Sequence, residues 1–286
     1  MKNMIDVIKD TLFDSIKLLP FLFLAYLLME YLEHKTGNKS KDIVKKSGKL
    51  GPLFGGIIGI FPQCGFSAAA ANLYAGKIIS MGTLIAVFLS TSDEMLPILI
   101  SEAAPVSLIL KVLAIKMVVG IIAGFAIDFV IKLIGKSQKE ETEEAVGHMC
   151  EHDHCDCEHG IFKSALKHTI NIFIFITIIT FVLNTLIYFI GEETIENAIA
   201  SVPVLGILVS AIFGLIPNCA GSVIITELYL SNLISFGSMI AGLLVGSGIG
   251  ILILFKTNKN VKENLTITGL LMLVGIIAGL IIDFIF

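Results

Sequence analysis

The chain has 286 residues, of which 55% are hydrophobic and 15% are charged, and its mean hydropathy is +0.90. This composition excludes a soluble globular domain of this length, because such domains contain about 25% charged residues. The net charge is −4, and all 20 basic residues are lysines. Backbone groups in lipid must be satisfied within their own segment, so we expect an all-α protein surrounded by membrane lipid, with no nucleic-acid partner.

Residues 11–32 form the first predicted membrane helix. About 20 apolar residues are enough for a helix to cross the hydrocarbon core. No small-residue cleavage site follows Met29, where Glu30, Tyr31 and Glu33 stand instead. We therefore expect this helix to be retained rather than removed as a signal peptide.

Residues 51–74 form a glycine-rich segment that we expect to be broken at Pro62. The length fits either one crossing or two half-length helices that meet as a hairpin. Gln63, Cys64 and Ser67 offer an amide, a thiol and a hydroxyl beside the freed backbone, and thiolates suit soft metal ions. The alternative is that proline and glycine only kink the helix and the cysteine is a small buried side chain.

The next predicted helix starts at Gly82 and carries Ser92, Asp93 and Glu94. At about 1.5 Å per residue, the two carboxylates lie roughly 17 Å from its start. Charged groups at that depth in a membrane are costly and are therefore candidates for a substrate or proton site. The alternative is that both acids lie near the aqueous end of a short helix.

Residues 137–164 form a predicted linker between two membrane units, residues 1–136 and 165–286. Its candidate metal ligands are His148, Cys150, His152, His154, Cys155, Cys157 and His159. Imidazole and thiolate ligands suit zinc and similar ions, although the spacing is not that of a folded zinc module. We predict a flexible metal-capturing or metal-sensing loop rather than a plain solvated linker, and no obligatory cofactor.

The second membrane unit repeats the first at a constant shift. Residues 119–124 and 274–279 have the same sequence, 155 positions apart, and the same shift relates Pro62 to Pro217 and Cys64 to Cys219. The matching polar candidates of the second unit are Asn218, Cys219, Ser222, Glu227 and Ser247. The second unit keeps a serine at 247 and lacks both acids. Of all these candidates, Cys64, Asp93, Glu94 and Cys219 are the predicted metal ligands.

Lysine placement predicts that the two units have opposite orientations. The loop at 34–51 is rich in lysine, whereas its counterpart at 191–204 has three glutamates and no lysine. In the next pair the asymmetry reverses, since residues 101–105 have no lysine and residues 256–262 have three. With the lysine-rich loops on the cytoplasmic side, two inverted repeats of about five helices follow, if each broken segment is a hairpin. Lys111 and Lys116 are exceptions that we expect to snorkel or to face protein.

Two other repeated features have a structural interpretation. The spacing of Gly120 and Gly124, and of Gly275 and Gly279, indicates close helix packing rather than chemistry. Asp128 and Asp283 lie near helix ends, where an interfacial position is the simpler explanation.

Inverted repeats with interrupted helices are typical of secondary transporters. Carboxylates desolvated in a membrane titrate nearer neutral pH, which makes proton exchange a candidate driving force. Half-helix amino termini instead favour an anion, so a permease for an anionic or organic metalloid species stays open. A passive channel also stays open. A membrane-embedded enzyme is the remaining alternative, but the sequence has no recognisable nucleophile and base and no His-Glu-x-x-His motif.

The chain resembles a family of ten-helix heavy-metal exporters, whose members are labelled arsenic efflux proteins or manganese transporters. The resemblance rests on the motifs at 61–67, 72–74, 82–86, 91–94 and 217–219. It implies efflux of a divalent heavy metal, manganese or arsenite. We expect a multi-pass protein of the plasma (inner) membrane, with the His/Cys linker cytoplasmic and a homo-oligomer as an open possibility. The Cys-Ser-Cys-Gly motif of organoarsenical permeases is absent from this sequence.

Overall fold

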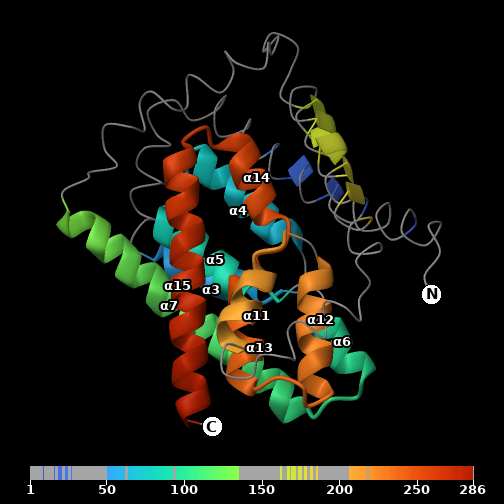
Figure 1. Cartoon of the computed structure of the whole chain (residues 1–286). Coiled ribbons are helices and arrows are strands. Elements are labelled where there is room, and N and C mark those ends of the chain that lie inside the picture. The colour runs from blue at the N-terminus through green and yellow to red at the C-terminus, as the bar shows by residue number, and fades with distance from the viewer. Residues whose placement is uncertain are drawn as a thin grey trace.

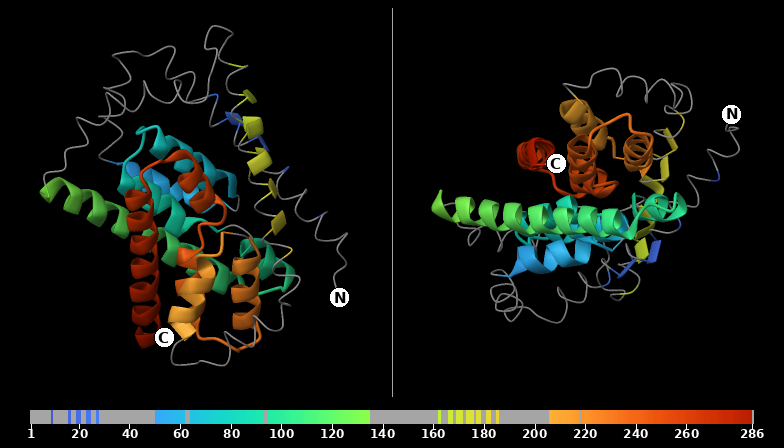
Figure 2. Two further views of the ribbon diagram at one scale, coloured as in Figure 1. Left: turned by 45° about the horizontal axis from the view of Figure 1, so that its top comes forward. Right: turned by 90° about the horizontal axis from the view of Figure 1, so that it is seen from below.

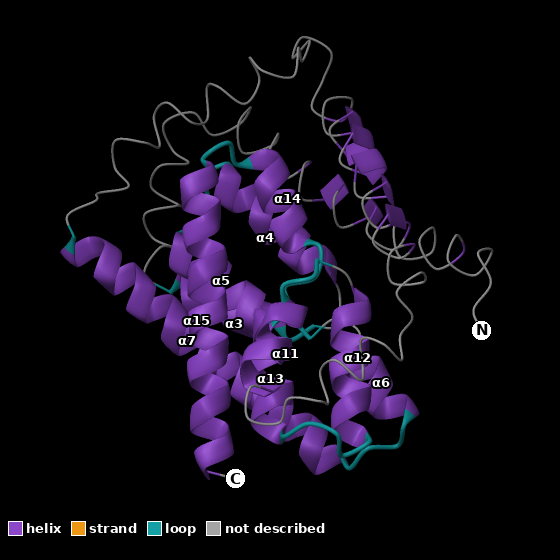
Figure 3. Cartoon of the chain, in the orientation of Figure 1, coloured by secondary structure: helices purple, strands orange, loops and turns teal. Residues whose placement is uncertain are grey.

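The structure is a computed structural model that describes residues 50–61, 64–92, 95–134, 206–217 and 219–285, together with single residues before 50 and between 162 and 185. Throughout these residues the regular elements are α-helices, and no strand occurs among them (Figure 3). The prediction of an all-α fold is confirmed for this part of the chain.

Two series of helices follow one another along the chain (Figure 1). The first series is α3 (Gly51–Gly59), α4 (Cys64–Ala75), α5 (Met81–Ser90), α6 (Met95–Ser101) and α7 (Val106–Leu133). The second series is α11 (Gly206–Gly214), α12 (Cys219–Leu230), α13 (Phe236–Val245), α14 (Gly250–Thr257) and α15 (Val261–Ile285). Each helix of the second series begins 155 positions after its counterpart, so the sequence repeat is also a repeat of helix order and helix starts.

Within the described residues, four spans are long and apolar enough to cross a membrane: Met81–Ser101, Val106–Leu133, Phe236–Thr257 and Val261–Ile285. The span made of α5 and α6 is 75% buried, and the span made of α13 and α14 is 83% buried. By contrast, α7 and α15 are only 22% and 33% buried. The broken spans therefore lie inside the protein, and α7 and α15 present much of their surface to the lipid.

The short helices α3, α4, α11 and α12 have 9 or 12 residues each. At about 1.5 Å per residue, each extends over roughly half of the 30 Å hydrocarbon core. A helix therefore ends at Gly59 and another begins at Cys64, as expected for a segment broken around Pro62.

The helix that the sequence predicted to continue from Gly82 through Glu94 is interrupted, because α5 ends at Ser90 and α6 begins at Met95. The Ser90 hydroxyl donates to the Ala86 carbonyl at 2.7 Å, and the Thr91 hydroxyl donates to the Val87 carbonyl, also at 2.7 Å. Side-chain bonds to carbonyls one turn back offer the backbone an alternative to the helical pattern and often accompany a bend or an end of a helix. Pro97 has no N–H to continue the helical pattern from upstream.

The counterpart of this interruption lies between Val245 and Gly250. Gly248 has a φ of 54°, which a residue with a side chain rarely adopts. The sequence therefore breaks the matching helices by different means. Hydroxyl groups and a proline act in the first series, and glycines act in the second.

The predicted close packing at the repeated glycines is confirmed. A Cβ atom on Gly124 would lie 2.6 Å from the Gly82 carbonyl oxygen, and one on Gly279 would lie 2.7 Å from the Gly237 carbonyl oxygen. The backbones of α5 and α7, and of α13 and α15, are thus in direct contact. In lipid the hydrophobic effect does not drive helices together, so the close contact of these backbones stabilises the helix pairs through dispersion interactions.

Asp128 and Asp283 each bind the start of a central helix. Asp128 accepts a hydrogen bond from the Ser80 hydroxyl at 2.7 Å and from the Gly82 N–H at 2.9 Å. Asp283 accepts the matching bonds from Ser235 and Gly237, both at 2.6 Å. A carboxylate at a helix amino terminus satisfies free N–H groups and interacts favourably with the helix dipole. Both aspartates therefore have a structural role.

The two series exchange partners with each other. Helix α4 packs against α14, and α12 packs against α6, while α5 contacts α13 and α15 (Figures 1 and 2). Seen from below, α7 lies between α3 and the helices of the second series (Figure 2). The buried core of α5 and α13, which includes Leu84, Ile85, Phe88, Ile240 and Leu244, joins the two series. Each short helix after a Pro-x-Cys motif thus lies beside a broken span of the other series.

Candidate substrate site

The two interruptions of the first series are adjacent. Ser92, which follows the end of α5 and is 2% exposed, donates a hydrogen bond to the Ile60 carbonyl at 2.5 Å. Ile60 is the residue that caps the end of α3. One hydroxyl thus connects the segment after α3 with the segment after α5, 32 residues apart in sequence.

The matching interruptions of the second series also meet. A Cβ atom on Gly246 would lie 3.7 Å from the carbonyl oxygen of Gly214, the last residue of α11. The Ser247 carbonyl accepts from the Gly250 N–H at 3.1 Å, which closes a tight turn. The Ser247 hydroxyl is buried and has no hydrogen-bond partner among the described residues, unlike that of its counterpart Ser92. A buried hydroxyl without a partner carries a penalty of about 1–3 kcal/mol, which makes Ser247 a candidate ligand for a bound species.

The two series meet where α14 begins. A Cβ atom on Gly250 would lie 2.9 Å from the Cβ of Ser67 and 2.8 Å from the ring of Phe88. Ser67 is fully buried on α4. The structure therefore brings Ser67, from the first Pro-x-Cys motif, next to the turn that contains Ser247.

Other predicted site residues lie farther away or are not described. Ser222 is half-buried on α12, where its carbonyl accepts from the Thr226 hydroxyl at 2.7 Å. Glu227 is exposed and lies eight residues after the start of α12, or about 12 Å along the helix, so the structure does not bring it to the interruptions. Cys64 and Cys219 are the first residues of α4 and α12.

Several predicted ligands fall outside the described residues. They are Gln63, Asp93, Glu94, Asn218 and the linker residues His148, Cys150, His152, His154, Cys155, Cys157 and His159. Among the residues that are described, no three His, Cys, Asp or Glu side chains gather in one place to hold a metal ion. Hydroxyl groups and backbone carbonyls are therefore what this part of the chain offers at the interruptions.

Lys116 is a buried cation for which the sequence analysis proposed no site. It lies on α7, is 1% exposed, and donates from Nζ to the Leu243 carbonyl near the end of α13. The expectation that it snorkels or faces protein is resolved in favour of protein. The sequence could have indicated a role for Lys116 through its depth in the membrane. It lies ten residues after Val106, which places it about 15 Å into a 28-residue apolar helix.

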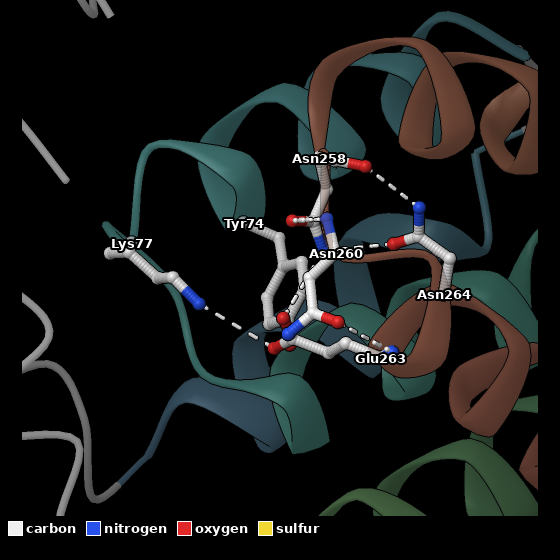
Figure 4. A network of polar contacts seen from close by, with 6 residues as sticks. All are labelled: Tyr74, Lys77, Asn258, Asn260, Glu263 and Asn264. Carbon is white, nitrogen blue, oxygen red and sulfur yellow. Dashed lines mark hydrogen bonds and ion pairs between the residues drawn. The ribbon is translucent and has the colours of Figure 1, made fainter. Parts of the chain in front are cut away.

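A second polar cluster ties the end of α4 to the start of α15 and to Asn258, which follows α14 (Figure 4). The Tyr74 hydroxyl donates to Glu263, and the Lys77 ammonium lies 3.5 Å from the same carboxylate. Asn258 donates to the Asn264 side chain at 2.8 Å, and Asn264 donates back to the Asn258 carbonyl, also at 2.8 Å. The positions that match Glu263 and Asn264 in the first series are Leu108 and Ile109. The cluster therefore has no equivalent between α12 and α6.

These elements define a polytopic α-helical membrane protein whose central spans are interrupted beside buried polar side chains. A sequence model of one protein family matches residues 2–189 and residues 165–286. The chain belongs to this family, which is described as "Putative, 10TM heavy-metal exporter". Its coarse function is therefore that of a metal-efflux transporter, and the resemblance to this family is confirmed. A search of curated proteins and a search of solved structures each found no match.

Proposed function

We propose that the protein is a secondary-active transporter that exports a metal or metalloid ion by alternating access at a site between its interrupted helices. The observation that carries the proposal is the meeting of interruptions from both series, with α4 against α14 and α12 against α6. Transporters with inverted repeats bind substrate where discontinuous helices meet near the midplane of the membrane. The relative motion of two such units then exposes the site to one side at a time.

Helix directions support an inverted relation between the units. The start of α5 lies against the end of α7, since the Gly82 N–H binds Asp128, and a Cβ on Gly120 would lie 2.9 Å from the Ala86 carbonyl. Helices α5 and α7 therefore run antiparallel.

The contacts of α7 with the second series complete this argument. The Lys111 ammonium lies 4.6 Å from the centroid of the Phe236 ring at the start of α13, and Lys116, farther along α7, reaches Leu243 near the end of α13. Helices α7 and α13 thus cross with their starts on the same side. Since the start of α5 lies at the opposite end of α7, the starts of α5 and α13 lie on opposite sides, as two inverted repeats require.

The proposed site combines described and undescribed residues. Ser67, Ser92 and Ser247 supply hydroxyls at the interruptions. The thiols of Cys64 and Cys219 supply soft ligands, and Asp93 and Glu94 supply negative charge, as predicted from sequence. Gln63, Asn218 and Ser222 complete the polar set, while Glu227 is a weaker member because it is exposed. Carboxylates and thiolates together favour a divalent heavy metal, manganese or arsenite over an anion.

The direction, driving force and location follow from the same proposal. Proton exchange through Asp93 and Glu94 drives export, because neutralising a carboxylate lowers the free energy of releasing a cation. The protein lies in the plasma (inner) membrane with residues 137–164 on the cytoplasmic side. Cysteine labelling tests this topology, which predicts that positions 41 and 154 react from the cytoplasm and position 193 from outside.

Uptake into proteoliposomes tests the transport proposal. The ions are Mn²⁺, Zn²⁺, Cd²⁺, Fe²⁺ and arsenite, each measured with and without a pH gradient, with arsenate as the anionic alternative. We expect accumulation of at least one cation or arsenite that increases with the proton gradient. Asp93→Asn and Cys64→Ser should abolish it while the protein stays inserted. Flux that is indifferent to the gradient would indicate a channel, and full activity in both variants would place the site elsewhere.

A further inference from the structure

Lys116 is a buried charged residue that is not a member of the proposed transport site. It projects from α7 of the first series to the Leu243 carbonyl of α13 in the second series, and it is almost completely buried. At about 15 Å from the start of its helix, it lies near the middle of the hydrocarbon core. A cation at this depth is retained only where a partner compensates the loss of water.

One partner of the Lys116 ammonium is the Leu243 carbonyl, which the interruption of α13 releases. In a continuing helix the Leu243 carbonyl would accept from the N–H of residue 247, but α13 ends at Val245. The Gly246 N–H still binds the Gly242 carbonyl at 2.9 Å, which is the last bond of the helix. The Leu243 carbonyl therefore belongs to the free, partially negative end of a half-helix, where a cation is favoured.

The ends of α5 and α13 differ in their side chains. The hydroxyls of Ser90 and Thr91 bond back to the Ala86 and Val87 carbonyls at the end of α5, while Val245 and Gly246 stand in the matching positions at the end of α13. The residue that matches Lys116 on α15 is Leu271, which is fully buried. The fold thus accommodates an apolar residue at this position, so that packing alone does not require the lysine.

A second oxygen in the same interruption has no partner. The Ser247 hydroxyl is 1% exposed and receives no hydrogen bond from the described residues. Freed carbonyls at half-helix ends, together with hydroxyls, are the oxygen ligands that transporters use to bind monovalent cations. A freed carbonyl and an unpartnered buried hydroxyl are therefore present at one interruption, and the Lys116 ammonium binds the carbonyl.

We propose that the end of α13 is a monovalent-cation site that Lys116 permanently occupies with its own ammonium group. The tethered ammonium holds the second interruption against α7 and makes the protein independent of a free monovalent cation at this position. Removing the side chain should expose a site for ammonium or potassium ions, which have a similar size. The binding of ammonium or potassium at the end of α13 does not depend on whether the protein is a transporter. Only the expected effect on ion flux rests on the proposed function.

The test compares variants of the full-length protein, purified in detergent, by thermal unfolding in ammonium, potassium or choline chloride. Lys116→Ala removes the ammonium and leaves space, whereas Lys116→Met fills the space without charge. Lys111→Ala is the matched control, because Lys111 is on the same helix and contacts α13 through the Phe236 ring. Choline chloride controls for ionic strength, since choline is too large for the vacated position.

We expect the midpoint of Lys116→Ala to rise by about 3 °C or more at a tenfold excess of ammonium or potassium over its dissociation constant. The wild type, Lys116→Met and Lys111→Ala should respond no more to these salts than to choline. In proteoliposomes, flux through Lys116→Ala should depend on ammonium or potassium, while wild-type flux should not.

The outcomes separate this proposal from the proposed function. Stabilisation of Lys116→Ala by ammonium, together with absent transport in the wild type, would support the cation site and count against the transport proposal. Equal responses to ammonium and choline would overturn the cation site. Lys116→Ser is a second variant that leaves space at this position. The proposal is abandoned if ammonium and potassium raise neither the unfolding midpoint nor the ion flux of Lys116→Ala or Lys116→Ser.

Discussion

Replacing Ser92 and Ser247 by alanine, one at a time, should have different effects on stability although the two serines occupy matching positions, since only Ser92→Ala should destabilise the protein. The Ser92 hydroxyl donates to the Ile60 carbonyl at 2.5 Å, and Ser92→Ala would leave that partly buried carbonyl without its donor. The expected loss is about 1–2 kcal/mol, which combines the hydrogen bond and the unsatisfied acceptor.

Ser247→Ala removes a hydroxyl that is buried and has no partner in the described structure. Its removal should be neutral or stabilising by up to about 1 kcal/mol, because no hydrogen bond is lost and a buried polar group disappears. With about 2–4 °C per kcal/mol, the two midpoints should differ by about 2 °C or more. Thermal unfolding of the purified variants, without substrate, measures this difference.

Transport provides an independent readout for the same pair. If Ser247 contributes an oxygen to a bound ion, Ser247→Ala should weaken the apparent ion affinity while stability is unchanged. Equal destabilisation by both substitutions would refute the reasoning, because it would mean that the Ser247 hydroxyl makes a hydrogen bond comparable to that of Ser92.

Three further predictions concern other parts of the chain. Asp128→Asn should destabilise the protein by about 0.5–2 kcal/mol, and Asp283→Asn by a similar amount, since each carboxylate binds the start of a central helix; unchanged unfolding midpoints would contradict that role. A double-mutant cycle of Tyr74→Phe and Glu263→Gln should give a coupling of about 1 kcal/mol in thermal unfolding, and strict additivity would exclude an energetic link between α4 and the start of α15. Deleting residues 150–159 should weaken the apparent metal affinity in a flux assay and leave the maximal rate largely intact, because a ligand-rich tether raises local concentration without moving ions itself; complete loss of flux in an inserted variant would make the linker part of the pathway.

The sequence by itself determined the class of the protein and its internal repeat. Hydropathy predicts membrane helices because lipid cannot satisfy backbone groups, and this physical requirement acts locally on each segment. The shift of 155 positions is visible in the glycine motifs at 119–124 and 274–279, and the helix starts follow the same shift. The breaks around Pro62 and Pro217 were likewise predictable, since proline disrupts a helix through its own ring and its missing N–H.

Only the tertiary structure decided which polar groups meet. The interruption after Ser90 was missed because hydropathy does not distinguish a continuous apolar helix from one in which hydroxyls near the end bond back to backbone carbonyls. The role of Lys116 depends on a partner 127 residues away in sequence. The role of Asp128 depends on partners 46 and 48 residues away. Local sequence carries no record of such distant pairs, because a buried cation or carboxylate is stabilised by the particular carbonyl or N–H group that packing brings to it.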